Sequence, residues 1–160
     1  MFVAAMLAVA SQTNCIKDII LGGLAQIPSS SRLYEEIMLV LDGYENNVSQ
    51  ADCFRSIHEK YNEHDGHDWC HTISNARIVA ASLLYGGGDF ARSICMAVEA
   101  GFDTDCNGAT VGSVLGMANG IESIPEYWTK PFNDTLYTSI FGLNSVKISD
   151  RVKLTLEHIQ

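Results

Sequence analysis

The amino-acid sequence predicts an all-α fold. Hydrophobic residues recur at helical spacing in nearly every segment, and no run shows the strict alternation of apolar and polar residues that is typical of a half-exposed β-strand. Serine, aspartate and glycine stand between the segments, where helix caps are expected. A chain of 160 residues, 47% of them hydrophobic, can bury one sizeable core. We therefore expect a single all-helical unit over residues 1–160, without a linker.

The first predicted helix is the apolar run from Met1 to Ala10. This run imitates a signal peptide, but no basic residue precedes it, and it is too short to span a bilayer. We favour a buried helix over a signal peptide at this position.

The later helices begin at residues that can cap them. Asn14, Ser49 and Asp89 each precede a helical pattern, and the serine-rich turn at residues 28–31 precedes another. The polar segment at residues 62–70 predicts a loop. Acidic residues inside the helical patterns are expected on solvent-facing surfaces, namely Glu35, Glu36, Glu99 and Glu122. The predicted helices run over residues 15–25, 32–42, 49–61, 72–85 and 90–100, then through the glycine-rich segment before residue 120, around 126–128 and, after a loop, over 149–158.

Composition excludes some classes of function. A net charge of −9 with 10 Lys and Arg argues against a general binder of nucleic acids or of anionic membranes. The five cysteines have irregular spacing and an odd number, so they predict no disulfide framework. Free cysteines of this kind favour a reducing compartment, and we expect a cytoplasmic protein.

The most informative segment places two carboxylates before a glycine-rich helix. Asp103 and Asp105 stand in a predicted tight turn, and glycine then recurs at every fourth position, at Gly108, Gly112, Gly116 and Gly120. Each glycine inside a helix costs about 1 kcal/mol relative to alanine, so a compensating contact is needed. Residues spaced by four share one face of a helix, and this face is therefore predicted to pack closely against a neighbour.

Two neighbouring carboxylates repel each other unless a cation or a proton lies between them. The EF-hand loop fits the first six positions of this segment, but it requires a glutamate at its twelfth position, where this chain has Val114. Oxygen ligands favour Mg²⁺, Mn²⁺ or Ca²⁺ over zinc. The alternative is an aspartate that only caps the helix beside a solvated neighbour.

The segment from Gly101 to Ser113 resembles the C-terminal metal signature of the ADP-ribosylglycohydrolase family, roughly Gly-x-Asp-x-Asp-Thr/Ser-Asn followed by a glycine-spaced helix. Residues 26–32, 71–76 and 131–136 resemble other segments of the same family. The resemblance implies a compact orthogonal helical bundle of the ADP-ribosylglycohydrolase type. It covers nearly the whole chain, but only the C-terminal half of the family's domain; the N-terminal half, with its own acidic ligands and catalytic carboxylate, has no counterpart in this sequence.

By this resemblance, the expected function is a hydrolase that cleaves the glycosidic bond of ADP-ribosylated proteins or small ADP-ribosyl conjugates. The complete domain is expected to use two Mg²⁺ ions, or Mn²⁺ in their place. The alternative is a catalytically inactive, crystallin-like or ligand-binding member of the same fold. Because the partner ligands and the catalytic carboxylate are absent, we expect this chain alone to be inactive and to self-associate through the apolar surface left exposed.

The resemblance also implies roles for particular residues. Asp103, Asp105 and Cys106 are expected to bind the metal. Substrate-binding residues are expected at His71, Thr72, Asn75, Asn107 and Gly108, the last two through their backbone N–H groups. No catalytic residue is assigned.

Cys106 departs from the family pattern, which has threonine or serine at this position. A thiol is a poor ligand for Mg²⁺, so the metal is held by fewer groups, the site is tuned differently, or the cysteine only fills space. A helix N-terminus is also expected to lower the pKa of this thiol.

The loop over residues 63–71 has three interpretations. The first is a zinc site, because the loop holds four possible zinc ligands, although their spacing is crowded: His64, His67, Cys70 and His71. A solvated loop is the second interpretation, and a wall of the substrate pocket is the third. A nucleophilic pair of a cysteine with His71 is the weakest of the alternatives, because no third residue orients it.

Overall fold

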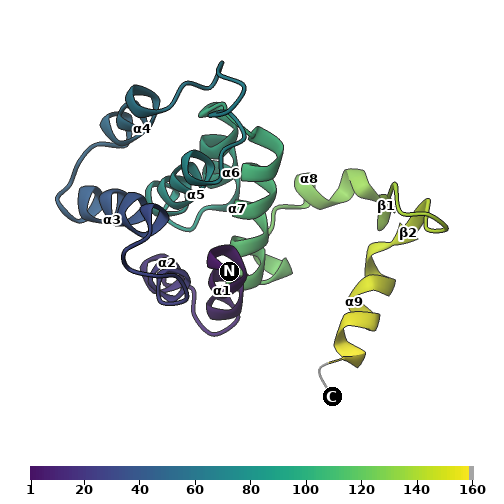
Figure 1. The fold of residues 1–160 in the computed structure, drawn as a ribbon. Helices are drawn as coiled ribbons and strands as arrows, with labels where there is room; N and C mark the ends of the chain where they lie inside the picture. Colours follow the sequence, from purple (N-terminus) through teal and green to yellow (C-terminus); the bar gives the residue numbers. More distant parts are fainter. Residues whose placement is uncertain (159–160) are drawn as a thin grey trace. The chain divides into compact units, whose positions relative to one another are not determined.

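Helix α5 (Thr72–Gly86) forms the centre of the larger of two compact units in the computed structural model, which describes residues 1–158 (Figure 1). Twelve residues of α5 are buried, and apolar side chains occupy all sides of this helix. A helix that is apolar all round is expected inside a core. The larger unit spans Met1–Ser123, and the smaller unit begins at Ile124.

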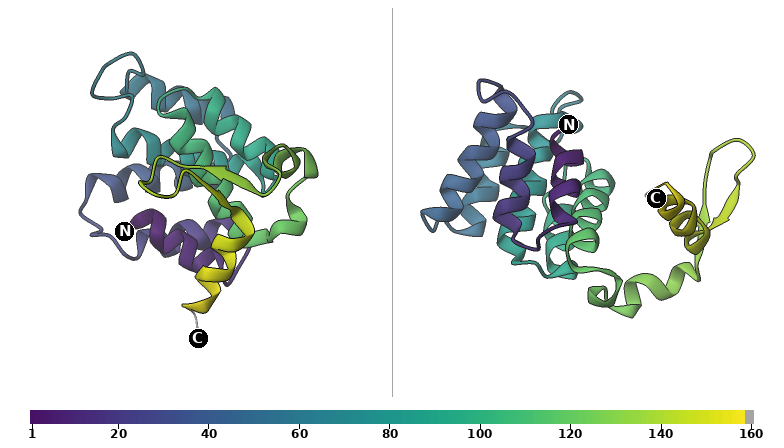
Figure 2. Two further views of the ribbon diagram at one scale, coloured as in Figure 1. Left: turned by 90° about the vertical axis from the view of Figure 1, so that its right-hand side faces the viewer. Right: turned by 90° about the horizontal axis from the view of Figure 1, so that it is seen from below.

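The larger unit is entirely helical, which confirms the predicted fold class. Helices α6 and α7 lie side by side, as do α1 and α2 (Figures 1 and 2). Helices α2, α3, α4, α6 and α7 all pack against α5. The elements of this unit are α1 (Phe2–Ala10), α2 (Ile16–Leu24), α3 (Arg32–Glu45), α4 (Gln50–Lys60), α5, α6 (Phe90–Glu99), α7 (Thr104–Asn119) and the 3-10 helix η1 (Ile121–Ser123).

Helix α1 buries one side of the apolar N-terminal run. Phe2, Met6 and Ala10, which are spaced by four, are buried in the core, whereas Val3 and Ala8 are exposed. The predicted buried helix is therefore confirmed. Among the described residues, no helix combines the length and the apolar character needed to span a membrane.

Most of the predicted helix caps are confirmed. The side chains of Ser31, Ser49 and Asp89 accept hydrogen bonds from the backbone N–H groups of the residues three positions on. Asn14 is the exception, because α2 begins one residue later, with Cys15 at its N-cap. The hydroxyl of Thr13 accepts the backbone N–H of Cys15 at 3.1 Å and so fixes the chain ahead of that helix.

The glycine face of α7 packs against α6, as predicted, over part of its length. A Cβ atom added at Gly108 would lie 3.3 Å from Val98 Cγ2, and one added at Gly112 would lie 3.3 Å from Ile94 Cδ1. Gly120 does not belong to this packing face, because it follows the end of α7 with φ 77°, and a Cβ atom added there would meet no neighbouring atom within 4 Å.

Glu36 was expected at the surface, and this expectation is wrong. Its carboxylate is buried in α3, where it accepts a hydrogen bond from Arg77 Nη1 of α5 at 2.9 Å and contacts the ammonium of Lys60 from α4. Arg77 is also buried, and its Nη2 donates to the Ser56 hydroxyl at 3.0 Å. A buried carboxylate is tolerated here because cations from two other helices neutralise it.

The smaller unit contains a short hairpin that the sequence analysis did not predict. Strands β1 (Thr135–Tyr137) and β2 (Ser145–Lys147) pair in antiparallel register, with Leu136 opposite Val146 (Figure 2). Strands of three residues are too short to show an alternating pattern. The other elements of this unit are α8 (Glu126–Thr129), the 3-10 helix η2 (Lys130–Phe132) and α9 (Ile148–Glu157).

Asp134 caps α9 from outside that helix. Its carboxylate accepts hydrogen bonds from the backbone N–H and the hydroxyl of Ser149, at 2.8 and 2.7 Å, and both bonds lower the pKa of Asp134.

No side chain between Ile124 and His158 is fully buried. Whether residues 1–160 act as one domain stays a prediction.

Candidate functional site

The turn between α6 and α7 has an unusual backbone. Gly101 has φ 75° and Phe102 has φ 58°, so two consecutive residues adopt the left-handed conformation. The positive φ at Gly101 favours glycine, and a Cβ atom there would also displace the flexible carboxylate of Glu63. The side chain of Phe102 is buried, which holds a conformation that is costly for a residue other than glycine. The chain then enters α7 at Asp103.

The side-chain amide of Asn75 fixes this turn to the start of α5. Its oxygen accepts hydrogen bonds from the backbone N–H of Asp103 at 3.1 Å and from Nδ2 of Asn107 at 2.7 Å. Its nitrogen donates to the carbonyls of Trp69 at 3.0 Å and His71 at 2.9 Å. An amide side chain can make four hydrogen bonds, and all four are made here.

The carboxylates of Asp103 and Asp105 converge with the thiol of Cys106. One ligand atom from each of the three residues lies within 4.8 Å of the others. Asp103 stands at the N-cap of α7, but its side chain makes no capping hydrogen bond. The carboxylate of Asp103 is therefore not used as a helix cap, which argues against the interpretation as a capping aspartate. The positive end of the helix dipole favours anionic groups at this position.

A pocket of about 390 Å³ lies beside the converging side chains. Asp103 and Cys106 form part of its wall. Thr72, Asn75 and Asn107, three of the predicted substrate-binding residues, line it as well. The apolar part of the wall comes from several helices and includes Phe2, Leu33 and Val79. His71, Asp105 and Gly108 are not part of the wall.

A sequence model of a protein family, described as ADP-ribosylglycohydrolase, matches residues 1–155 of this chain. The chain belongs to the ADP-ribosylglycohydrolase family. No curated protein and no solved structure matches the chain significantly. Membership of the ADP-ribosylglycohydrolase family supports a hydrolase of ADP-ribose conjugates, and the acidic turn is a candidate for the metal-binding group of such an enzyme.

Cys106 differs from the residue expected at its position in the ADP-ribosylglycohydrolase family, and the structure corrects the expectation about its acidity. The thiol donates a hydrogen bond to the Asp103 carboxylate, and this bond, together with the negative charges of Asp103 and Asp105, raises the pKa of Cys106. The helix N-terminus was expected to lower that pKa. The two adjacent carboxylates favour the uncharged thiol, which acts in the opposite direction to a helix N-terminus.

The predicted substrate-binding residues make different contacts, and these decide which of them could meet a ligand. The ring of His71 caps α5, since Nδ1 accepts the backbone N–H of Ile73 at 3.2 Å. The backbone N–H of Asn107 donates to the carbonyl of Asp103 at 2.9 Å, so it is not available to an anion. Gly108 is buried against α6. Thr72 is exposed in the pocket wall, which makes it the best placed of these residues to meet a ligand.

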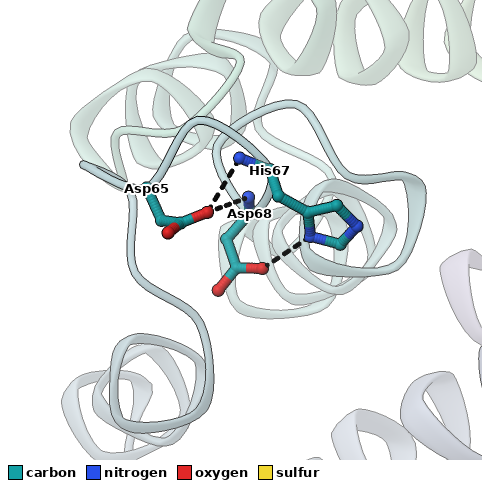
Figure 3. A group of neighbouring side chains, drawn as sticks. All are labelled: Asp65, His67 and Asp68. Atoms are coloured by element: carbon teal, nitrogen blue, oxygen red, sulfur yellow. Dashed lines mark hydrogen bonds and ion pairs between the residues drawn. The ribbon is translucent and has the colours of Figure 1, made fainter.

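Figure 3 shows the second group of candidate metal ligands, which comes from the histidine-rich loop. The carboxylate of Asp65 accepts the backbone N–H groups of His67 and Asp68 at 2.8 and 3.4 Å, and His67 Nδ1 lies 3.0 Å from the Asp68 carboxylate. These bonds shape an exposed loop. Of the side chains considered for zinc, His67 alone belongs to this group, and Cys70 lines the pocket instead.

Sequence reasoning missed the apolar wall and the role of Asn75. Phe2, Leu33 and Val79 lie in three different helices, and each looked like an ordinary core position in the sequence. Asn75 was predicted to bind substrate, whereas its hydrogen bonds indicate that it positions Asp103. The one available signal was that His71 and Asn75 are spaced by four, which places them on one helix face.

Proposed function

We propose that this chain supplies the metal-binding turn of a hydrolase that cleaves the glycosidic bond between ADP-ribose and a protein or small acceptor. One observation carries the proposal: in a member of this family, the side chains of Asp103 and Asp105 converge beside a pocket of about 390 Å³. A pocket of this volume falls in the range that holds small ligands.

The donor chemistry of the turn fits a divalent cation in part. Two carboxylates suit Mg²⁺ or Mn²⁺, the ions that the family resemblance implies, and Asp103 and Asp105 would hold the ion. The thiol of Cys106 does not suit Mg²⁺. A divalent ion bound there would supply positive charge that orients ribose hydroxyls and a water molecule and that offsets developing charge.

The residues around the turn have supporting roles in this proposal. Asn75 holds the backbone of Asp103, so that the carboxylate meets the pocket in one orientation. The apolar wall at Phe2, Leu33 and Val79 excludes water from one side of the ligand. Thr72 offers an exposed hydroxyl to a polar group of the substrate.

We expect no turnover from these 160 residues alone. Among the described residues that line the pocket, Asp103 is the one carboxylate, and the proposal uses it as a metal ligand. No second carboxylate and no imidazole then remains in the described wall to protonate a leaving group or to activate water. A two-metal site would also need further anionic ligands from elsewhere.

The test is hydrolysis of ADP-ribosyl-arginine and ADP-ribosyl-serine peptides with added Mg²⁺, Mn²⁺ or Zn²⁺. The chain is assayed alone and with the N-terminal portion of a family domain supplied in trans. Turnover that needs both parts and is lost in Asp103→Asn would support the proposal. Turnover by the chain alone would contradict the claim of an incomplete site. Binding of ADP-ribose without turnover in either case would favour the alternative, an inactive ligand-binding member.

A further inference from the structure

The metal-binding turn has a donor set that differs from the oxygen ligands of a magnesium site. Asp103, Asp105 and Cys106 each offer one ligand atom, and these atoms lie within 4.8 Å of one another. Asp105 and Cys106 are exposed and Asp103 is half-buried, so an ion from solvent can reach all three. The third donor is a sulfur atom.

Cys106 Sγ lies close enough to the Asp103 carboxylate for both to bind the same ion. Cys106 Sγ and a carboxylate oxygen of Asp103 lie within 4.8 Å of each other, so one ion can contact both atoms. An ion bound between these atoms would be held by a thiolate and a carboxylate, and the thiol proton would pass to solvent. The hydrogen bond from the backbone N–H of Asp103 to Asn75 fixes the backbone that carries these ligands.

The identity of the ion follows from the preference of each metal for oxygen or sulfur. Mg²⁺ requires oxygen ligands and binds through carboxylates and water. Zn²⁺ accepts both thiolate and carboxylate, and three protein ligands with one open position are typical of catalytic zinc sites. A site with two carboxylates and one thiolate therefore favours zinc, and its close substitute cobalt, over magnesium.

We propose that the site formed by Asp103, Asp105 and Cys106 binds a thiophilic divalent ion of the Zn²⁺ class, with Cys106 Sγ as a direct ligand. The inference rests on the proposed function only for the location of the metal. It assigns to Cys106 the role of selecting the ion, in place of the role of filling space.

The test uses the whole chain, with Co²⁺ as a spectroscopic probe for Zn²⁺. Co²⁺ is titrated into reduced protein, and the near-ultraviolet absorption of a thiolate bound to cobalt is recorded. Calorimetry with Zn²⁺ and with Mg²⁺ gives the ratio of the two affinities. The variants are Cys106→Ser, Asp105→Ala and, as a matched control, Cys95→Ser, which removes an exposed thiol that does not line the pocket.

We expect the wild type and Cys95→Ser to show the thiolate absorption at one equivalent of Co²⁺ and to prefer Zn²⁺ to Mg²⁺. Cys106→Ser should lose the absorption, and its preference for Zn²⁺ should fall at least about tenfold. Cys106 is exposed, so serine is expected to leave the fold unchanged, which circular dichroism checks. A Cys106→Ser protein that retains the absorption would overturn the inference.

Two other outcomes separate this inference from the proposed function. If Mn²⁺ or Mg²⁺ binds the wild type through Asp105 with no thiolate absorption from Co²⁺, sulfur ligation is overturned and the metal site stands. If no divalent ion distinguishes the wild type from Asp105→Ala, both the inference and the metal part of the proposed function fail.

Discussion

The side-chain oxygen of Asn75 lies 2.7 Å from Nδ2 of Asn107 and accepts its hydrogen bond, which joins the first turn of α5 to the first turn of α7. The side chain of Asn107 is buried, with 2% of the residue exposed. A buried amide that loses its partner keeps the full cost of its desolvation.

Asn75→Ala should therefore lower the free energy of unfolding by about 1–3 kcal/mol, because it leaves Nδ2 of Asn107 without its acceptor. It should also weaken ion binding at the turn, since the backbone of Asp103 loses an anchor. Urea denaturation and calorimetry measure the two effects. Thr72→Ala, at an exposed position in the same turn of α5, is the control, and equal midpoints for the two variants would show that Asn75 does not position the turn.

Asp105→Ala should reduce the thermal stabilisation that divalent ions give to the wild type. The reason is that one of the two converging carboxylates is removed, while the exposed position leaves the fold intact. Asp18→Ala is the control, because Asp18 also lies in the first turn of a helix but in neither group of candidate metal ligands among the described residues. The same response to ions in all three proteins would show that the turn is not a metal site.

Gly112→Leu should lower the free energy of unfolding by about 1–3 kcal/mol or more. A Cβ atom at this position already lies 3.3 Å from Ile94 Cδ1, so the rest of a leucine side chain has no space between α6 and α7. Ser113→Leu introduces the same side chain at the next residue, which is exposed, and should have a small effect. An unchanged denaturation midpoint for Gly112→Leu would mean that the two helices separate there at little cost.

Glu36→Gln should cost about 3–5 kcal/mol, because it leaves the buried guanidinium of Arg77 without its carboxylate. Glu35→Gln makes the same chemical change at the neighbouring exposed position and should lie within about 0.5 kcal/mol of the wild type. Chemical denaturation of the two variants side by side measures the difference. Similar midpoints would mean that water and the Ser56 hydroxyl satisfy the Arg77 guanidinium without the Glu36 carboxylate.

Tyr85 should make the protein sensitive to alkaline pH. Burial, with a smaller effect from Cys53, raises the pKa of Tyr85 to about 12, and its hydroxyl donates to the carbonyl of Val48 at 2.9 Å. The unfolded chain releases this proton near pH 10, so the stabilisation is complete below that pH and is lost between about 10 and 12. The loss is on the order of 2 kcal/mol.

The Tyr85 prediction is checked by the slope of the unfolding free energy against pH. Tyr85→Phe retains the ring that contacts Tyr44 but has no proton to lose. Its stability should therefore fall less steeply than that of the wild type above pH 10, whatever its value at neutral pH. Parallel slopes would show that the hydroxyl is hydrated in the folded protein.

Helix positions could be predicted from the sequence because their signals are local. Ser31, Ser49 and Asp89 cap helices through hydrogen bonds that span three residues, and the period of apolar residues covers one helix at a time. The hairpin between β1 and β2 was missed because each strand has three residues, which is too short to show an alternation of apolar and polar side chains. The burial of Glu36 was missed because Arg77, its partner, is 41 residues away in the sequence.

The candidate site, like the fold, could be predicted from the sequence only where its signals are local. The turn of Asp103 and Asp105 could be predicted because its residues are adjacent and resemble a family signature. The direction of the pKa change at Cys106 could not, because it depends on which carboxylate the thiol contacts. The pocket wall depends on helices that the sequence does not place side by side.

The hydrogen bond from the backbone of Asp103 to Asn75 joins residues 28 positions apart, and α6 lies between them. This contact requires the segment between the two residues to close into a loop, which costs conformational entropy. A newly synthesised chain can therefore complete most of its helices before the acidic turn is held in place. Under the proposed function, the site can therefore capture its ion only after the helices that carry the turn, α5 and α7, have docked.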